Sequence, residues 1–503
     1  MNGNPTDEKK RRLGGNILSL CSIEMFERLA YFGIRTVVPI YIMQADDPGG
    51  LHLTANHKAK IYAWWFFFQS ILPVVTGGYA DRYGYKRVLT FAIALNITGY
   101  VLMAFARDYT AFFTAIMVLA VGTAFFKPCL KGSLAQNLSK QNSSLGWGVF
   151  YWIANVGALI APIVSTLILG DPHTPEAWRN LFLASAGFTS INLLLLLTFK
   201  DTPTGADKTQ NPMVVFRKTL TNLFEPRLLS FLMIMSCFYV MMFQVWDLQP
   251  NFISDWIDSR GLAEGLSFLP DALYLRITET TDSGARVPQQ LLLSLNPALV
   301  VLCVIPVSWI AARVRSLSAL LIGMTLAVTG VLVAGLTRQA GVLLLGITVF
   351  SLGEMLTGPK KNEYLGLIAP PGKKGLYLGY VSMVAGIGGI LGSRLAGHVY
   401  GRYGEKATLA LRYLAEHTLF GRDKNWNGAV GSLEESLGVS RTEAVRKLQE
   451  VEGIDAGEAA RLLWETYHPQ YYVWVPFAAT GLIAIIAFAA YGRLARKWCD
   501  MDA

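Results

Sequence analysis

Apolar residues occur along this chain in twelve long segments that are separated by polar breaks. Each segment is close to the ~20 residues that an α-helix needs to cross a bilayer. The pattern therefore predicts twelve membrane-spanning helices. The seventh segment is the least regular, because Gln244, Trp246 and Asp247 interrupt it. The segments begin near Leu18, Tyr62, Val88, Ala111, Trp147, Leu181, Leu229, Leu291, Ser318, Val342, Leu376 and Val473.

The longest polar stretch in the middle of the chain, Lys200 to Arg227, divides the segments into six and six. It opens with a linker composition, and Met213 to Phe224 then alternates basic and apolar residues as an interfacial helix does. Two six-helix halves joined by a hinge are typical of transporters that bind substrate between two lobes.

A second long polar stretch precedes the last span. In it, Ser440 to Glu443 is typical of a capping box for a helix that runs to Glu452, and Asp455 is expected to cap a helix that reaches Trp464. This stretch is either a small helical cap or a surface that binds a partner or captures substrate. We expect a cytoplasmic N-terminus (1–15), a first bundle (16–199), a cytoplasmic linker (200–227), helices seven to eleven (228–399), an extracytoplasmic helical insertion (400–468) and helix twelve with a cytoplasmic C-terminus (469–503).

Composition supports a membrane protein. Of the 503 residues 52% are hydrophobic and 16% are charged, whereas soluble domains are about 25% charged. The net charge of +9 could indicate nucleic-acid binding, but the basic residues gather in loops on one side of the expected membrane. By the positive-inside rule both termini lie in the cytoplasm, and we expect a multi-pass protein of the plasma (inner) membrane that binds no nucleic acid. The five cysteines show no metal-binding spacing, so we expect no metal.

The first span carries charges that lipid does not tolerate. A charged side chain at the bilayer centre costs roughly 2.5–3.5 kcal/mol on insertion scales. Glu24, Arg28, Tyr31 and Arg35 recur at helical spacing, and Glu27 lies beside Arg28. This stripe must therefore face something other than lipid.

The turn between the second and third spans resembles a signature of the major facilitator superfamily. It runs Gly-Gly-Tyr-Ala-Asp-Arg-Tyr-Gly-Tyr-Lys-Arg, and the family pattern is G-x-x-x-D-R-x-G-x-[RK]-[RK]. The resemblance implies an all-α membrane protein with twelve transmembrane helices in two six-helix bundles. It implies a conformational role for the matching positions and is silent on substrate. Those positions are Gly77, Asp81, Arg82, Gly84, Lys86 and Arg87.

Further segments resemble the proton-coupled oligopeptide transporters within that superfamily. Glu24-x-x-Glu27-Arg28 followed by Tyr31-Phe32-Gly33 is similar to their ExxER motif, and the segment from Gly122 through Lys127-Pro128 to their fourth-span motif. The segments 150–159, 294–297 and 353–359 resemble their fifth, eighth and tenth spans. The matches occur in the family's order and extend from the first span to the tenth.

The resemblance implies a proton-coupled symporter that imports di- and tripeptides by alternating access, not an enzyme, with protons as the coupling ion and no cofactor. Small peptides and protons would be its partners within the lipid bilayer, and it would act as a monomer. Arg35 and Lys127 would bind the peptide carboxylate, and Asn155, Asn296 and Glu354 its ammonium group. Tyr31, Tyr151 and Gln244 would complete the pocket. The proton-coupling set would be Glu24, Glu27, Arg28, Lys127 and Glu354.

Simpler roles remain open for these residues. The first-span charges could form a structural cluster, Lys127 could reach an interface, the asparagines could bridge helices, and both tyrosines could only pack. Glu354 could pair with Lys360 or Lys361.

The chain also departs from the family pattern. Phe243 stands where an acid is frequent, unless Asp247 replaces that acid. Tyr380-Val381-Ser382 lacks an expected tryptophan, Lys360-Lys361 adds charge, and Phe32 removes a hydroxyl. Transport of nitrate, another organic anion or a peptide-like metabolite therefore remains an alternative, as does a receptor that binds peptides without transporting them.

Overall fold

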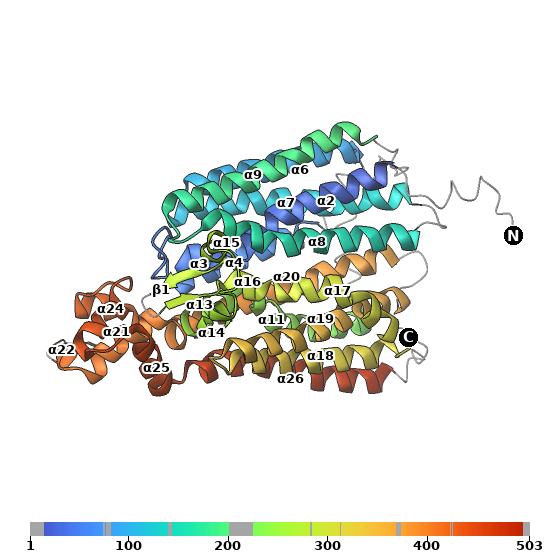
Figure 1. Cartoon of the computed structure of the whole chain (residues 1–503). Coiled ribbons are helices and arrows are strands. Elements are labelled where there is room, and N and C mark those ends of the chain that lie inside the picture. Colours follow the sequence, from blue (N-terminus) through green and yellow to red (C-terminus); the bar gives the residue numbers. More distant parts are fainter. Residues whose placement is uncertain are drawn as a thin grey trace, which may run out of the picture.

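The computed structural model describes residues 15–73, 76, 82–138, 143–200, 225–281, 284–311, 313–368, 374–422, 424 and 426–495. Long helices occur at each of the twelve predicted spans (Figure 1). In the first half they are α2 (Gly15–Arg35), α4 (Ala55–Ile71), α6 (Tyr85–Phe105), α7 (Tyr109–Asn137), α8 (Ser143–Leu169) and α9 (Pro175–Thr198). In the second half they are α11 (Pro226–Met242), α17 (Leu295–Ala311), α18 (Ser316–Gly335), α19 (Ala340–Ile368), α20 (Lys374–Tyr403) and α26 (Pro469–Ala495).

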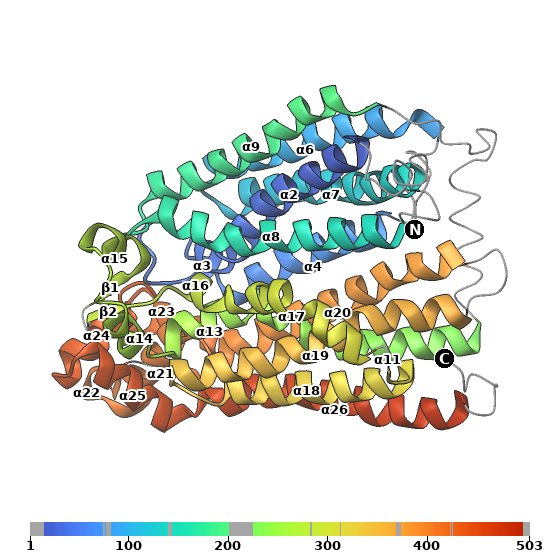
Figure 2. The same cartoon turned by 45° about the vertical axis from the view of Figure 1, so that its right-hand side comes forward.

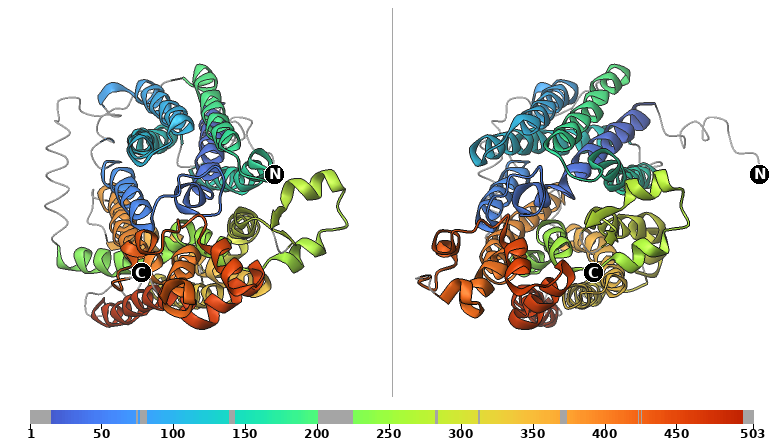
Figure 3. Two further views of the ribbon diagram at one scale, coloured as in Figure 1. Left: turned by 90° about the vertical axis from the view of Figure 1, so that its left-hand side faces the viewer. Right: turned by 60° about the vertical axis from the view of Figure 1, so that its left-hand side comes forward.

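The helices form two bundles that lie side by side, the first six in one lobe and the last six in the other (Figures 2 and 3). Among the described residues, nine helices are long and apolar enough to cross a membrane by length and composition alone. Helix α2 is not one of the nine, and it carries four charged side chains. Its polar face can be accommodated only because neighbouring helices cover it.

The irregular seventh span is a continuous crossing with a change of local geometry. Helix α11 ends at Met242, α12 (Gln244–Asp247) continues it, and α13 (Gln249–Trp256) follows with Pro250 in its first turn. The amide nitrogen of Gln244 donates to the carbonyl of Val240 at 2.7 Å across the junction of α11 and α12, whereas its buried Oε1 has no hydrogen-bond partner among the described residues. The predicted interruption therefore marks where a span ends and not where one is missing.

The shorter elements lie at one end of the bundles, opposite the described chain ends Gly15 and Ala495 (Figure 1). We call this the insertion end, and the opposite one the termini end. The first set comprises α3 (Val38–Met43), α14 (Arg260–Gly265), α15 (Asp271–Ile277), the hairpin β1 (Glu279–Thr281) and β2 (Gly284–Arg286), and α16 (Gln289–Leu293). The second set comprises α21 (Lys406–His417), α22 (Leu419–Arg422), the 3₁₀ turn Val430–Ser432, α23 (Leu433–Leu437), α24 (Ala444–Glu452) and α25 (Ala456–Tyr467).

One capping prediction in the insertion is confirmed and the other is wrong. Asp455 and Glu458 form the reciprocal capping box at the start of α25. Helix α24 instead begins at Ala444 without a side-chain cap: the hydroxyl of Ser440 donates to the carboxylate of Glu443 at 3.1 Å and does not accept from a backbone N–H of the helix. The interfacial helix expected at 213–224 lies outside the described residues.

The two lobes meet most closely where α4 packs against α20. Glycines on α20 allow the approach: a Cβ added at Gly389 would lie 2.5 Å from the ring of Phe66, and one at Gly397 would lie 2.4 Å from Cβ of Ala59. Small residues let membrane helices approach closely and gain van der Waals contact. This seam therefore joins the lobes through backbone proximity.

Replacing Gly397 with leucine should force α20 away from α4, since no side chain fits there. Overpacking of this kind costs about 1–3 kcal/mol, so the melting temperature of the purified protein should fall. Gly187→Leu on α9 is the matched control, because an added Cβ there meets nothing within 4 Å. Equal melting temperatures for the two variants would contradict a tight seam.

Candidate functional site

A cavity of about 670 Å³ lies between the lobes and receives side chains from both. From the first lobe, α2, α4 and α7 contribute Arg28, Tyr31, Phe32, Arg35, Phe66, Gln69, Ser70, Lys127, Pro128 and Lys131. From the second lobe, α11, α12, α19 and α20 contribute Tyr239, Phe243, Trp246, Glu354, Lys361, Tyr380, Val381, Ser382 and Ala385. Of the predicted site residues, the structure brings Arg28, Tyr31, Arg35, Lys127 and Glu354 together at this cavity.

The carboxylates of the first span lie directly behind the cavity wall. Arg28 Nε contacts Glu24 Oε1 at 2.7 Å and Glu27 Oε2 at 3.9 Å, and both acids are buried. Glu27 Oε2 has no hydrogen-bond donor among the described residues. A buried carboxylate that is only loosely paired can gain or lose a proton when its surroundings change.

Lys127 lines the same cavity from α7. Its Nζ is 5.3 Å from the ring centre of Tyr31, whose hydroxyl donates to Gln69 at 3.0 Å. No described carboxylate lies within 4.0 Å of the lysine, so the expected pairing with the first-span acids is not a direct contact here. The lysine instead presents its charge to the cavity.

Arg35 is held by aromatic rings. Its guanidinium carbon lies 4.5 Å from the ring centres of Tyr62 and Trp65 and 4.9 Å from that of Phe66, and only 4% of the residue is exposed. Cation–π contacts stabilise the charge without neutralising it. The arginine can therefore still attract an anion in the cavity.

Glu354 supplies the negative charge of the second lobe. Its carboxylate accepts a hydrogen bond from Asn296 at 2.8 Å, and that amide also donates to Ser351 at 2.9 Å. Neither neighbouring lysine pairs with it. Lys360 contacts Glu363 at 3.0 Å, and Lys361 donates to the hydroxyl of Tyr239. Asn296 thus orients Glu354 without lining the cavity itself.

Three further predicted residues do not line the cavity in this structure. Asn155 donates to the backbone of Tyr151 within α8, and Tyr151 is 48% exposed. Gln244 is buried, and its amide nitrogen is bonded to the carbonyl of Val240, as described above.

The signature between the second and third spans is partly described. Gly77 and Asp81 lie outside the described residues. Gly84 precedes α6 with a φ of +94°, a conformation that favours glycine. Lys86 donates to the carbonyl of Phe199 at 2.8 Å, Arg82 lies 5.8 Å from the ring of Tyr83, and Arg87 is exposed.

A buried ion pair that sequence reasoning missed joins the lobes at the insertion end. Lys58 Nζ on α4 lies 3.2 Å from Asp247 Oδ1 on α12 and donates to Asn251 Oδ1 at 3.0 Å. Ser393 on α20 donates to the other oxygen of Asp247. Asp247, the acid that could replace the one absent at Phe243, therefore forms an interlobe ion pair. The sequence signal was the charge of Lys58 near the start of an apolar segment, which indicates that this residue needs a buried partner.

More polar contacts close the same end. Gln44 donates to Asp255 at 2.8 Å, and Gln289 donates to the carbonyl of Thr36 at 2.9 Å. Arg441 of the insertion contacts Glu405 at 3.2 Å and donates to the carbonyls of His52 and Leu53 in the first lobe at 2.8 and 3.1 Å. The insertion is thereby bonded across the lobe boundary.

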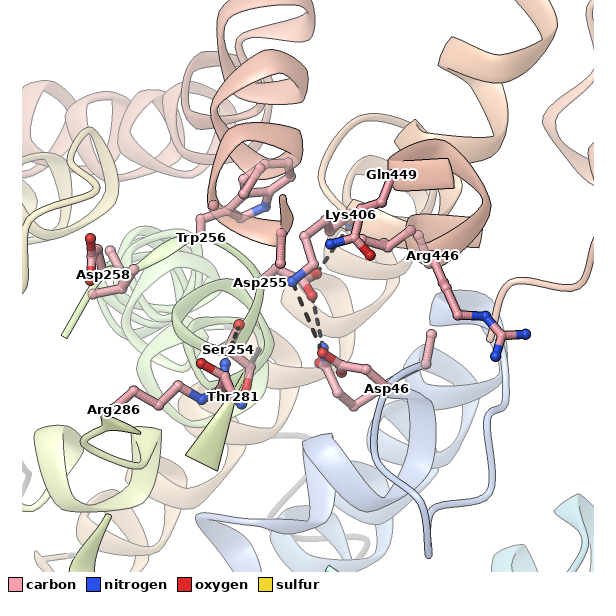
Figure 4. A pocket seen from close by; sticks show the side chains of 18 of the residues that line it. Asp46, Ser254, Asp255, Trp256, Asp258, Thr281, Arg286, Lys406, Arg446 and Gln449 are labelled. Carbon is pink, nitrogen blue, oxygen red and sulfur yellow. Dashed lines mark hydrogen bonds and ion pairs between the residues drawn. The ribbon is translucent and has the colours of Figure 1, made fainter. Parts of the chain in front are cut away.

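Figure 4 shows a second, polar pocket at this end, with a volume of about 270 Å³. Lys406 donates from its backbone amide to the carboxylate of Asp255 at 3.2 Å, and the side-chain Nζ of Lys406 lies 4.0 Å from Asp46. Asp46 and Lys406 lie on different lobes, so charges face each other across the pocket. Below it, the rings of Phe32 and Trp246 lie 5.6 Å apart and those of Phe66 and Phe243 lie 4.8 Å apart. These cross-lobe aromatic pairs line the main cavity.

His173 links the loop after α8 to the β-hairpin. Its Nδ1 lies 2.7 Å from Asp47 and its Nε2 lies 3.4 Å from Glu279. Burial alone would lower the pKa of His173, but the two carboxylates raise it to about 10. The imidazolium therefore bridges the lobes at neutral pH.

Comparison with known proteins is consistent with this architecture. The profile described as Major Facilitator Superfamily matches residues 20–278, more than half of the chain. A di-/tripeptide transporter of Lactococcus lactis subsp. cremoris is 28% identical over 29% of this chain and 31% of its own length. Multidrug resistance protein MdtH of Yersinia enterocolitica is 21% identical over 66% of this chain and 75% of its own length.

Two solved structures share the fold. A POT family transporter in complex with 5-aminolevulinic acid has a TM-score of 0.65 at 14% identity, with 96% of each chain covered. The nucleoside transporter NupG has a TM-score of 0.63 at 13% identity, with 95% of this chain and 99% of the other covered. The chain spans about a third of the length of the di-/tripeptide transporter that it matches. The resemblance to peptide transporters inferred from the motifs is confirmed, and so is the twelve-helix, two-bundle fold.

Replacing Lys58 with methionine should leave the buried Asp247 without its cation. Breaking a buried pair from one side costs about 3–5 kcal/mol, so the melting temperature should fall markedly. Lys58→Met combined with Asp247→Asn should recover part of the loss, since no buried charge remains. Arg412→Met, which breaks a half-exposed pair with Glu416 on α21, is the control. A Lys58→Met effect no larger than the control's would contradict the interlobe role.

His173 gives a pH-dependent prediction. Because its pKa is raised in the folded protein, its stabilising contribution is full below the unfolded pKa near 6.5 and is lost as pH rises through about 10. The difference in melting temperature between the wild type and His173→Gln should shrink steadily from pH 6.5 upward. His417→Gln, at a more exposed histidine, should show no such trend. A His173→Gln difference that is independent of pH would argue against the bridge.

Proposed function

Since this chain belongs to the Major Facilitator Superfamily, we propose that it is a proton-coupled symporter that imports di- and tripeptides by alternating access. The observation that carries the proposal is the cavity between the lobes. Arg35 and Lys127 present positive charge on one side and Glu354 presents negative charge on the other. This arrangement complements a zwitterion of limited length, because each end of the ligand meets its opposite charge.

The proposal gives each lobe one end of the peptide. The terminal carboxylate binds at Arg35 and Lys127, and the ammonium group binds at Glu354, which Asn296 orients. The curated relatives named as peptide transporters support this assignment of substrate. Protons are the coupling ion, and no other cofactor is needed.

Proton coupling is assigned to Glu24, Glu27 and Arg28. Glu27 is the site of protonation, because its carboxylate is buried, lies 3.9 Å from Arg28 and lacks a hydrogen-bond donor among the described residues. Protonation removes the negative charge of Glu27 near Arg28 and Lys127, so the cavity attracts the substrate carboxylate more strongly. Substrate and proton then bind to the same state of the transporter.

Alternating access follows from the closed end. The insertion end faces the outside of the plasma membrane, and both termini lie in the cytoplasm, as the distribution of basic loops predicts. The Lys58–Asp247 pair, the aromatic pairs and the α4–α20 seam hold the outer end shut in this state. Opening toward the outside requires these contacts to separate while the opposite end closes. We propose that a monomer performs the full cycle.

The test is uptake of labelled dialanine into proteoliposomes with an imposed pH gradient. One pH unit supports at most about tenfold accumulation per coupled proton. The wild type should accumulate the peptide, whereas Glu27→Gln should only equilibrate it while still exchanging internal for external peptide. Glu176→Gln, at an exposed acid in the first turn of α9, is the control and should accumulate like the wild type.

Two outcomes would contradict the proposal. Accumulation by Glu27→Gln against the peptide gradient would remove Glu27 from coupling. Saturable peptide binding by the wild type with no flux in either direction would favour a receptor over a transporter.

A further inference from the structure

The cavity contains more positive charge than a simple peptide can balance. Five cationic side chains line it, namely Arg28, Arg35, Lys127, Lys131 and Lys361, whereas Glu354 is the one carboxylate among the described lining residues. Adding the buried Glu24 and Glu27 behind Arg28 still leaves two positive charges in excess. A zwitterionic dipeptide carries no net charge and leaves this excess unchanged.

Lys361 is the cation that the described residues of the second lobe contribute to the cavity, and no carboxylate pairs with it directly. It is only 5% exposed, its Nζ donates to the hydroxyl of Tyr239, and it lies 4.3 Å from the centre of that ring. No carboxylate among the described residues lies within 4.0 Å of it, although its neighbour Lys360 contacts Glu363 at 3.0 Å. Burying an ammonium group without a counter-ion is costly, and an anionic ligand group would reduce that cost.

The position of Lys361 relative to Glu354 defines what could reach both. The two residues are seven positions apart on α19, which places them on the same face about 10 Å apart along the axis. An extended dipeptide backbone spans about 7 Å. An acidic side chain on the second residue can therefore extend to Lys361 while the ammonium group stays at Glu354.

We propose that Lys361 is a specificity-determining residue that binds a side-chain carboxylate, so that the preferred substrates are acidic peptides with glutamate or aspartate at the C-terminal position. This inference rests on the proposed function and refines it. Tyr239 holds the ammonium group of Lys361 in place, and its hydroxyl stays next to that group when the side-chain carboxylate of the peptide binds. The carboxylate of the peptide backbone still binds at Arg35 and Lys127.

The test compares two peptides of nearly equal size, alanyl-glutamate and alanyl-glutamine, as inhibitors of labelled dialanine uptake. Alanyl-glutamate should inhibit the wild type at about tenfold lower concentration, the scale expected for one ion pair shielded from water. Lys361→Gln should abolish the preference by weakening alanyl-glutamate alone, and Lys361→Arg should retain it. Lys360→Gln is the matched control, since that neighbouring lysine does not line the cavity.

Equal inhibition of the wild type by both peptides, or a preference that survives Lys361→Gln, would overturn the inference. So would a Lys361→Gln variant that loses dialanine uptake together with both inhibitors, because the lysine would then serve the transport cycle. Failure of the proposed function is a separate result. If dialanine is not transported, thermal shifts of the full chain with each peptide still report the preference. A shift with glutarate as large as that with alanyl-glutamate would retain the Lys361 site and remove the peptide assignment.

Discussion

The structure depends on one constraint, the cost of placing charge within an apolar span. Each ionisable group inside the helices needs a partner or a polar cavity, and the boundary between the two bundles is where both are available. Helix α2 directs its acids toward Arg28, Arg35 lies against three rings, and Lys58 reaches Asp247 on the other lobe. The groups that would prevent membrane insertion of a single helix thus become the groups that define the interface.

The same constraint determines which contacts join the two lobes. Apolar packing between membrane helices has no hydrophobic driving force, so the lobes are joined by close backbone contact and by polar pairs. At the insertion end these are the glycine seam of α20, the Lys58–Asp247 pair and the contacts of Arg441 with the first lobe. Polar groups that separate can bond to water instead, so contacts of this kind allow the two lobes to separate, whereas a continuous packed core of the same size would not. The insertion adds its own contact across this boundary, so it helps to join the lobes at this end although it lies outside the bundles.

Most of the cavity-lining residues that depart from the family pattern belong to the second lobe. Phe243, Lys361 and Tyr380 to Ser382 all line the cavity from the second lobe. The first lobe contributes Glu24, Glu27, Arg28 and Lys127, which match the family motifs, and departs from them at Phe32. In the proposed function, binding of the peptide ends and proton coupling are assigned to the first lobe together with Glu354, and the shape and charge of the side-chain pocket are assigned to the second.

The twelve helices, the two-bundle division and the existence of a charged stripe on α2 could be predicted from the sequence, because hydrophobic length and helical spacing are local properties. The start of α24 was misjudged since Ser440 and Glu443 bond to each other. Lys58 contacts Asp247, which lies 189 positions away in the sequence. Glu354 accepts from Asn296 and does not pair with the adjacent lysines, and the amide nitrogen of Gln244 donates to the backbone carbonyl of Val240. Which charge pairs with which depends on distances between helices remote in sequence, and a single chain's periodicity carries no such distances. The sequence alone shows which charged groups need a partner within the membrane. Which residue is that partner depends on how helices remote in sequence pack together.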